Sequence, residues 1–305
     1  MVSKIAQYQG TAGDFLLERK VVIEEPFLLG RLGAHLILMP DGQRFVLKTD
    51  KIESTQLALL RFATEHGFDS GCRLPQLHAE GQVDGSNWIV LEHITAPKIA
   101  SLIDTEPQRC IDTVWEMAQG YQRLLASFLA EHPIAMDYEK EKRWLFEKIQ
   151  AWGAPIVKAG LMEQHKLESI YQAWAQLVEQ HGTSMFAAIH GNMHGDHTFL
   201  PATGSGYVVD PVCWYRPGRA EYYDWVRALD WMILKAKDPK QMFSLVIKNI
   251  STRLSHVDKN ELHWFLALRG LGALGADMLA NMDTPAVEAA EERRNCFLKL
   301  ITGEY

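Results

Sequence analysis

Two short segments of the chain hold side chains whose types and spacing could carry out chemistry. The first is the run Ile189-His190-Gly191-Asn192-Met193-His194-Gly195-Asp196-His197. The second is the apolar run Tyr207-Val208-Val209, which ends in Asp210 and Pro211. Imidazoles and carboxylates bind metals or move protons, and glycine lets the backbone turn sharply and approach a ligand closely. We therefore expect any chemistry of this protein to occur at these two segments.

The composition of the whole chain narrows the class of protein. The 305 residues are 47% hydrophobic, which is typical of a globular protein with a sizeable core. The net charge of -7 disfavours a nucleic-acid binder, which usually carries a basic surplus. We see no apolar run of about 18 residues, so we expect no membrane span, and residues 1–7 lack the apolar core of a signal peptide. Four scattered cysteines without C-x-x-C spacing indicate neither a zinc site nor a disulfide framework, and favour the reducing cytoplasm.

The first hundred residues predict short strands with turns. Residues 34–39 and 45–48 are expected to form a β-hairpin, because Pro40-Asp41-Gly42 between them is a strong turn signal. The apolar spacing in 54–66 predicts a helix that ends at Gly67. Residues 88–92 predict another strand, preceded by a turn at 84–87.

The rest of the chain is predominantly helical by its apolar spacing. Helices are predicted over 110–131, 138–181, 220–237, 239–255, 260–281 and 285–302. The reactive run at 190–197 falls on a loop between short strands. The plan is an α+β protein with a small β-rich lobe, residues 1–95, and a larger helical lobe, residues 96–305. A cleft between two such lobes is the default ligand site.

This layout and these motifs resemble the aminoglycoside phosphotransferase and choline kinase superfamily, which has a protein-kinase-like two-lobe fold. The resemblance covers roughly residues 25–235. The family pattern is a glycine-containing hairpin, a strand lysine, a hinge strand, His-Gly-Asp-x-x-x-x-Asn, and a strand that ends in Asp. The resemblance implies ATP- and Mg²⁺-dependent transfer of phosphate to a small-molecule acceptor. The Asp210-Pro211 pair resembles the fructosamine kinase-like branch.

The resemblance assigns the nucleotide-binding residues to the first lobe. Lys48 stands where the family keeps its phosphate-pairing lysine, since anionic phosphates need a cation. Gly30 and Gly33 belong to the hairpin above it, and Glu92 and Ile94 to the hinge that binds adenine through backbone groups. The helix glutamate that usually holds the lysine is replaced here by Gln56, and Glu53, one turn earlier, could substitute.

The catalytic residues follow from the register of the His-Gly motif. His190 and Gly191 match it, so the catalytic Asp falls on Asn192 and the metal-binding Asn on His197. Asparagine cannot accept a proton as a carboxylate does, and imidazole suits magnesium poorly. Asp196, four residues further along the loop, could supply the missing carboxylate. Asp210 matches the metal-binding Asp. In the downstream segment, Asp224 is expected to accept hydrogen bonds that hold the catalytic loop.

Three functions stay open at this point. The first is a kinase for a hydroxyl- or amine-bearing metabolite, an aminoglycoside or a sugar-like acceptor. The second is a binding module that keeps the kinase fold without transfer, which Asn192 and Gln56 favour. The third is a metal hydrolase built on His190, His194, His197 and Asp210, although Gly191 and Gly195 disfavour the helix that such zinc sites use.

Most tryptophans are expected in the core; Trp214 and Tyr215 follow Asp210 and are expected near the cleft. The sequence indicates neither the acceptor nor an oligomeric state.

Overall fold

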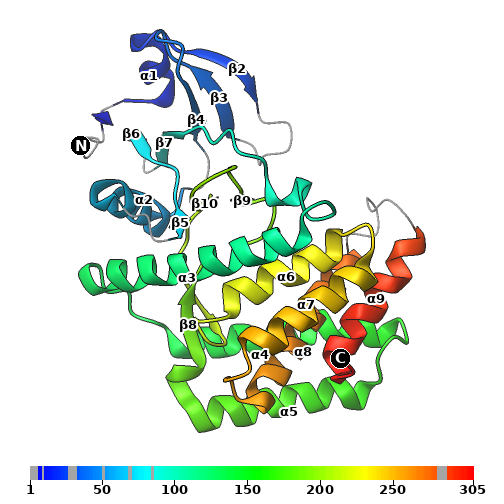
Figure 1. Cartoon of the computed structure of the whole chain (residues 1–305). Coiled ribbons are helices and arrows are strands. Elements are labelled where there is room, and N and C mark those ends of the chain that lie inside the picture. The colour runs from blue at the N-terminus through cyan, green and yellow to red at the C-terminus, as the bar shows by residue number, and fades with distance from the viewer. Residues whose placement is uncertain are drawn as a thin grey trace.

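A β-rich N-terminal sheet and a helical C-terminal part make up the structure, a computed structural model (Figure 1). It describes residues 6–8, 10–26, 33–49, 52–67, 71–83, 86–279 and 287–305. The sheet has six strands in the order β1-β6-β7-β4-β3-β2. Their bounds are β1 Ala6–Tyr8, β2 Val22–Pro26, β3 Ala34–Leu38, β4 Arg44–Lys48, β6 Leu77–Val83 and β7 Ser86–Glu92. The first pair, β1 with β6, is parallel and the other pairs are antiparallel.

The two faces of this sheet pack against different helices. Phe45 and Leu47 of β4 are buried with Phe15 of α1 (Ala12–Glu18) and Trp88. Val46, on the opposite face, packs against the core that the sheet shares with the helices. Because successive side chains in a strand alternate between faces, Lys48 belongs to the same face as Val46. The strand pattern therefore directs the lysine toward the helical part of the molecule.

Helix α2 (Ser54–His66) covers this second face and joins the sheet to the main core. Leu57, Leu59 and Leu60 are buried there with Leu77 and Ile89 of the sheet. The helix ends where Gly67 adopts a left-handed conformation at φ 59°, which glycine tolerates without steric penalty. The predicted helix at 54–66 and the hairpin of β3 and β4 are confirmed, whereas the turn predicted at 84–87 lies partly outside the described residues.

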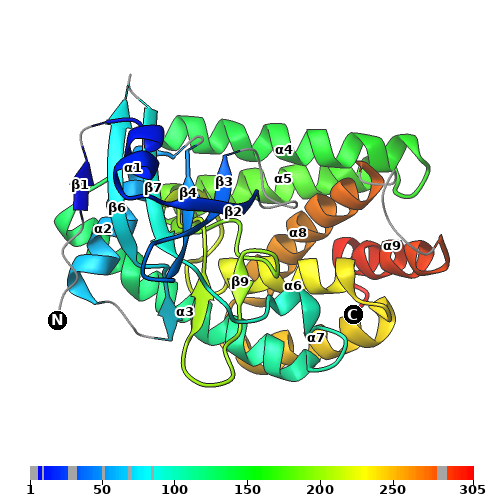
Figure 2. The same cartoon turned by 90° about the horizontal axis from the view of Figure 1, so that it is seen from above.

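The helical part consists of long helices around one apolar core (Figures 1 and 2). They are α3 Pro107–Glu131, α4 Tyr138–Lys158, α5 Gln164–His181, α6 Tyr223–Lys235, α7 Pro239–Arg253, α8 Lys259–Leu279 and α9 Val287–Thr302, with short 3-10 turns η1 Ile99–Ser101 and η2 Gly182–Met185. The stretch predicted as one helical region at 138–181 is two helices, because α4 ends at Lys158 and α5 begins at Gln164. In the part of the chain that is described, no helix is both long and apolar enough to cross a membrane; the cytoplasmic location stays a prediction.

Two small sheets flank the segments at 190–197 and 207–210. In one, β10 (Gly206–Val208) pairs with β9 (Thr198–Phe199) and with β5 (Cys72–Arg73). In the other, β8 (Phe186–Ile189) pairs with β11 (Trp214–Pro217). The run His190–His197 thus connects β8 to β9, and Asp210 follows β10. We call residues 190–197, which the family resemblance predicts to be catalytic, the catalytic loop.

Candidate active site

A buried carboxylate holds the start of the catalytic loop. Asp224, in the first turn of α6, accepts hydrogen bonds from the backbone N–H groups of His190 (2.9 Å) and Gly191 (2.7 Å). Burial raises the pKa of Asp224 to about 6, and the hydrogen bonds that it accepts offset only part of this effect. Gly191 has a φ of 72°, a left-handed conformation that lets the loop turn at this point. The predicted supporting role of Asp224 is confirmed.

His190 connects the loop to the strand that precedes Asp210. The side chain is completely buried, and its Nε2 lies 3.3 Å from the carbonyl oxygen of Val209. Its Nδ1 accepts a hydrogen bond from the backbone N–H of Asn192 at 3.2 Å. Burial lowers the pKa of His190 to about 4, with a further contribution from His197. The imidazole is therefore neutral near pH 7, and its position in the interior suits a residue that orients the loop.

Asn192 and His197 lie against each other across the loop. The side-chain nitrogen of Asn192 is 3.2 Å from His197 Nδ1, which is also 3.2 Å from the backbone oxygen of Asn192. The carbonyl of His197 accepts the N–H of Val209 at 2.9 Å. These contacts bring the two positions that depart from the family pattern next to the residue before Asp210.

Asp196 lies at the exposed end of the loop. Its side chain is 51% exposed, and its backbone N–H donates to Nδ1 of His194 at 3.3 Å. His194 stacks on His197, with ring centroids 4.3 Å apart, and on Trp231. Burial, followed by the effect of His197, lowers the pKa of His194 to about 2. The carboxylate of Asp196 thus remains open to solvent beside the neutral imidazole of His194.

Lys48 and Asp210 form an ion pair that links the N-terminal sheet to the helical part. Both side chains keep access to solvent, Lys48 at 22% and Asp210 at 40%. Burial acts to raise the pKa of Asp210, but the charge of Lys48 and its hydrogen bond outweigh this effect and hold the pKa below its usual range. Asp210 has a φ of 55°, an unfavourable conformation for a residue other than glycine and one that concentrates at functional sites.

The lysine does not use the helix partner that the sequence suggested. Among the described residues, no hydrogen bond or ion pair joins Lys48 to Gln56 or Glu53. Gln56 is buried in α2, and Glu53 is the exposed residue before its first turn. The expectation that Glu53 substitutes for the helix glutamate is therefore wrong in this structure, because the amino group of Lys48 pairs with Asp210 instead.

Of the four remaining nucleotide-binding candidates, the structure describes Gly33, Glu92 and Ile94. The carbonyl of Gly33 accepts the N–H of Thr49 at 2.8 Å, so Gly33 stands beside the end of β4. Gly30 lies outside the described residues. Glu92 ends β7, and its carboxylate accepts hydrogen bonds from Tyr207 (3.1 Å) and from the backbone N–H of Gln76 (3.2 Å). Ile94 follows in irregular, half-buried chain, where a backbone can bind a ligand.

The metal-hydrolase interpretation receives no support from the geometry. Within the described ranges, no group of three His, Cys, Asp or Glu side chains is arranged to hold a metal ion. His190 is engaged by Val209 and Asn192, and His194 is stacked between His197 and Trp231. The three histidines hold the loop together and do not converge on one point.

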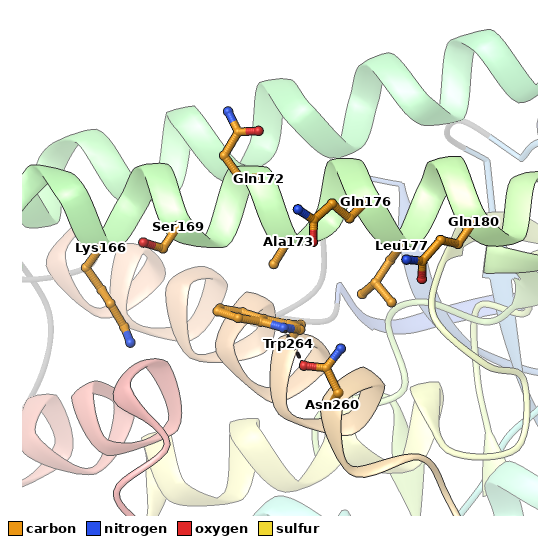
Figure 3. Close-up of a pocket in the computed structure, with 9 residues that line it drawn as sticks. All are labelled: Lys166, Ser169, Gln172, Ala173, Gln176, Leu177, Gln180, Asn260 and Trp264. Atoms are coloured by element: carbon orange, nitrogen blue, oxygen red, sulfur yellow. Dashed lines mark hydrogen bonds between the residues drawn. The ribbon is translucent and has the colours of Figure 1, made fainter.

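A polar groove of about 500 Å³ lies elsewhere, between α5 and α8 (Figure 3). It is lined by Lys166, Ser169, Gln172, Ala173, Gln176, Leu177, Gln180, Asn260 and Trp264. The indole N–H of Trp264 donates a hydrogen bond to Oδ1 of Asn260 at 3.0 Å. None of the site residues predicted from the sequence belongs to this groove, so we do not assign the chemistry to it.

Comparison with known proteins identifies the fold. No protein-family model matches the sequence, and no curated protein matches it either. Solved structures match over almost the whole chain. The apo form of a thermostable mutant of aminoglycoside phosphotransferase APH(4)-Ia has a TM-score of 0.54 at 10% identity, covering 95% of this chain and 98% of that chain.

The chain has the fold of an aminoglycoside phosphotransferase. A second structure of APH(4)-Ia matches with a TM-score of 0.55 at 12% identity, over 96% of this chain and 98% of that one. A ternary complex of an APH(4)-Ia mutant with ADP and hygromycin B gives 0.55 at 10% identity, over 95% and 97%. The predicted α+β, kinase-like fold is confirmed. The fructosamine kinase-like branch stays a prediction.

Proposed function

We propose that this protein is an ATP- and Mg²⁺-dependent phosphotransferase that acts on a hydroxyl or amine of a small molecule. The observation that carries the proposal is the Lys48–Asp210 pair beside the catalytic loop. A cation for phosphates and a carboxylate for the metal are the two charges that phosphoryl transfer requires. An APH(4)-Ia mutant with the same fold holds ADP together with hygromycin B, which supports a nucleotide and a small acceptor in one site. We assign the nucleotide to the junction of residues 1–95 and 96–305.

The side chains at this junction suit a nucleotide-bound magnesium ion. Magnesium is usually held by one or two protein carboxylates together with phosphate oxygens. Asp210 is partly exposed and uses only Oδ1 for Lys48, so it can provide such an oxygen. His197 is the second candidate ligand. When bound, the ion neutralises negative charge on the phosphates. Lys48 would release Asp210 and bind the phosphates, while Gly33, Glu92 and Ile94 would surround the rest of the nucleotide.

Phosphoryl transfer also needs a base that takes up the proton released by the acceptor molecule. The acceptor oxygen or nitrogen forms a bond to the γ-phosphorus, the bond from that phosphorus to the β,γ-bridging oxygen breaks, and ADP leaves. We assign the proton released by the acceptor to Asp196, because Asn192 has no carboxylate and Asp196 is solvent-accessible on the same loop. Asn192 would orient the acceptor through its amide, and His190, being fully buried, would position the loop.

Turnover of ATP in the presence of sugars and aminoglycosides tests this proposal. Asp196→Asn should lower the rate of transfer about 10²–10⁴-fold, the usual contribution of a general base, while leaving Mg²⁺-ATP binding intact. Asp104→Asn, an acidic residue that pairs with Lys237, is the matched control and should have no effect. An unchanged rate in Asp196→Asn would exclude Asp196 as the base.

A second outcome separates an enzyme from a binding module. Asn192 at the position of the family's catalytic Asp is the observation that favours a nucleotide-binding protein without transfer. Tight Mg²⁺-ATP binding with no transfer to any acceptor would support that alternative. If Asn192→Asp then creates transfer activity, the loop has kinase geometry and lacks only the carboxylate.

A further inference from the structure

Arg216, in β11, stacks against two tryptophans beside the strand that leads into the catalytic loop. Its guanidinium carbon lies 4.3 Å from the ring centroid of Trp144, in α4, and 5.1 Å from that of Trp214. Stacking on aromatic faces holds a guanidinium in a fixed plane. A fixed plane lowers the entropy cost of forming further hydrogen bonds.

The described residues form hydrogen bonds with one end of this guanidinium. Nη1 donates to Glu141 Oε2 and to the carbonyl of Tyr215, both at 2.7 Å. Within the described residues, Nε and Nη2 donate no hydrogen bond. Neither is among the buried polar atoms that lack a partner, and 17% of the side chain is exposed, so these donors reach solvent. Glu141 is buried and already paired, which leaves the cluster without a free carboxylate.

The free edge, formed by Nε and Nη2, has the geometry that binds a carboxylate through two parallel hydrogen bonds. The molecule itself uses the same edge elsewhere. Arg219 donates from Nε (2.8 Å) and Nη2 (2.7 Å) to the two oxygens of Glu261. Among the described residues, no carboxylate occupies the corresponding edge of Arg216.

The position of Arg216 connects its free edge to the proposed chemistry. In the pairing of β8 with β11, Trp214 lies opposite Ile189 and Arg216 opposite Ala187. Trp214 also lies against the loop itself, since a Cβ on Gly191 would be 3.0 Å from its ring. A ligand on the free edge of Arg216 would thus sit beside the strand that leads into the catalytic loop.

We propose, on the basis of the function proposed above, that Arg216 binds a carboxylate of the acceptor. The acceptor class is then a hydroxylated acid, such as a sugar acid or hydroxy acid, with a hydroxyl directed to the loop. A polycation is disfavoured, because Arg216 is itself a cation, both indole rings already stack on it, and the carboxylate of Glu141 is paired with it.

Three related sugars that carry a negative charge, no charge and a positive charge test this assignment on the protein. Calorimetry would measure the dissociation constants of glucuronate, glucose and glucosamine. We expect glucuronate to bind about 10- to 100-fold more tightly than glucosamine, as a hydrogen-bonded ion pair typically contributes. Glucuronate binding no tighter than the other two, or no glucuronate binding at all, would overturn the proposal.

Paired substitutions locate the effect. Arg216→Met with Glu141→Gln removes both charges at once, so no buried carboxylate is left unpaired, and should abolish the preference for glucuronate. Arg253→Met with Asp112→Asn is the matched control, because Arg253 also lies between two tryptophans, Trp115 and Trp225, and pairs with an aspartate. A preference that survives the first double substitution would contradict the assignment and point to binding elsewhere, such as the groove of Figure 3.

Titration of the same proteins with Mg²⁺ and AMP-PNP separates the two proposals. Nucleotide binding without a glucuronate preference rejects only the acceptor class, whereas absent nucleotide binding rejects the proposed function.

Discussion

At the scale of single residues, His190 makes the stability of the protein depend on pH. Its pKa is about 4 in the folded protein, chiefly because of burial, and about 6.5 in an unfolded chain. Between these values the unfolded state binds more protons than the folded state. The stability contributed by the neutral imidazole is therefore present above about pH 6.5 and is lost as pH falls toward 4.

His190→Gln should flatten this dependence. Since one pKa unit corresponds to about 1.4 kcal/mol, we expect the native protein to lose up to about 3 kcal/mol more than the variant between pH 6.5 and 4. Urea unfolding at both pH values measures the difference. Asp224, whose pKa is raised to about 6, acts in the opposite direction but is present in both proteins. Equal losses in the two proteins would show that His190 does not remain neutral.

At the candidate site, the sequence indicated the supporting contact of Asp224 but not the partner of Lys48. Asp224 was predictable, because an Asp near the start of a helix at that distance from His-Gly has a known supporting role. The partner of Lys48 was not predictable, because its contact with Asp210 depends on how β4 is placed relative to β10. Arg216 was missed as well. Its spacing of two from Trp214 on one strand was a usable signal, but the contact with Trp144 requires the packing of α4 against β11.

At the scale of elements, the catalytic loop is packed too closely for any side chain at Gly195. A Cβ there would lie 2.3 Å from Trp231 in α6 and 3.0 Å from the backbone nitrogen of Ala100 in η1. That nitrogen also donates to the Gly195 carbonyl at 3.1 Å. The close packing of the loop between η1 and α6 thus depends on the absence of a side chain at Gly195.

Gly195→Ala should therefore displace the loop. We expect a loss of about 1–3 kcal/mol in unfolding free energy, as is usual for overpacking, together with loss of transfer activity. Gly13→Ala in α1 is the control: its Cβ would have only a 3.4 Å contact, and helix propensity predicts no loss or a gain of up to about 1 kcal/mol. Thermal unfolding of both variants compares them, and equal stability would refute the tight packing.

The long elements were predictable and the short ones were not. The helices at 110–131, 239–255 and 260–281 correspond to α3, α7 and α8, because long amphipathic patterns specify a helix locally. Strands β5 and β9 have two residues each, too few for any pattern. Cys72 pairs with Gly206, so β5 exists only because distant parts of the chain meet.

At the scale of the whole molecule, the Lys48–Asp210 pair spans the junction of the sheet and the helical part. Both side chains are partly exposed, and such pairs contribute at most about 1 kcal/mol to stability. Lys48→Met should therefore lower the free energy of unfolding by less than about 1 kcal/mol. Lys237→Met, at a side chain 88% exposed, is the control in chemical denaturation. A loss of several kcal/mol would mean that the pair is structural.

A calorimetric titration with AMP-PNP in the presence and absence of Mg²⁺ tests the proposed nucleotide site at Lys48 and Asp210 most directly. We expect binding that requires Mg²⁺ and that weakens at least about tenfold in Lys48→Met and in Asp210→Asn, because each substitution removes a charged partner of the phosphates or the metal. Lys237→Met should bind as the native protein does. Absence of nucleotide binding, or binding that neither substitution alters, would contradict the assignment of Lys48 and Asp210 to a phosphotransferase site.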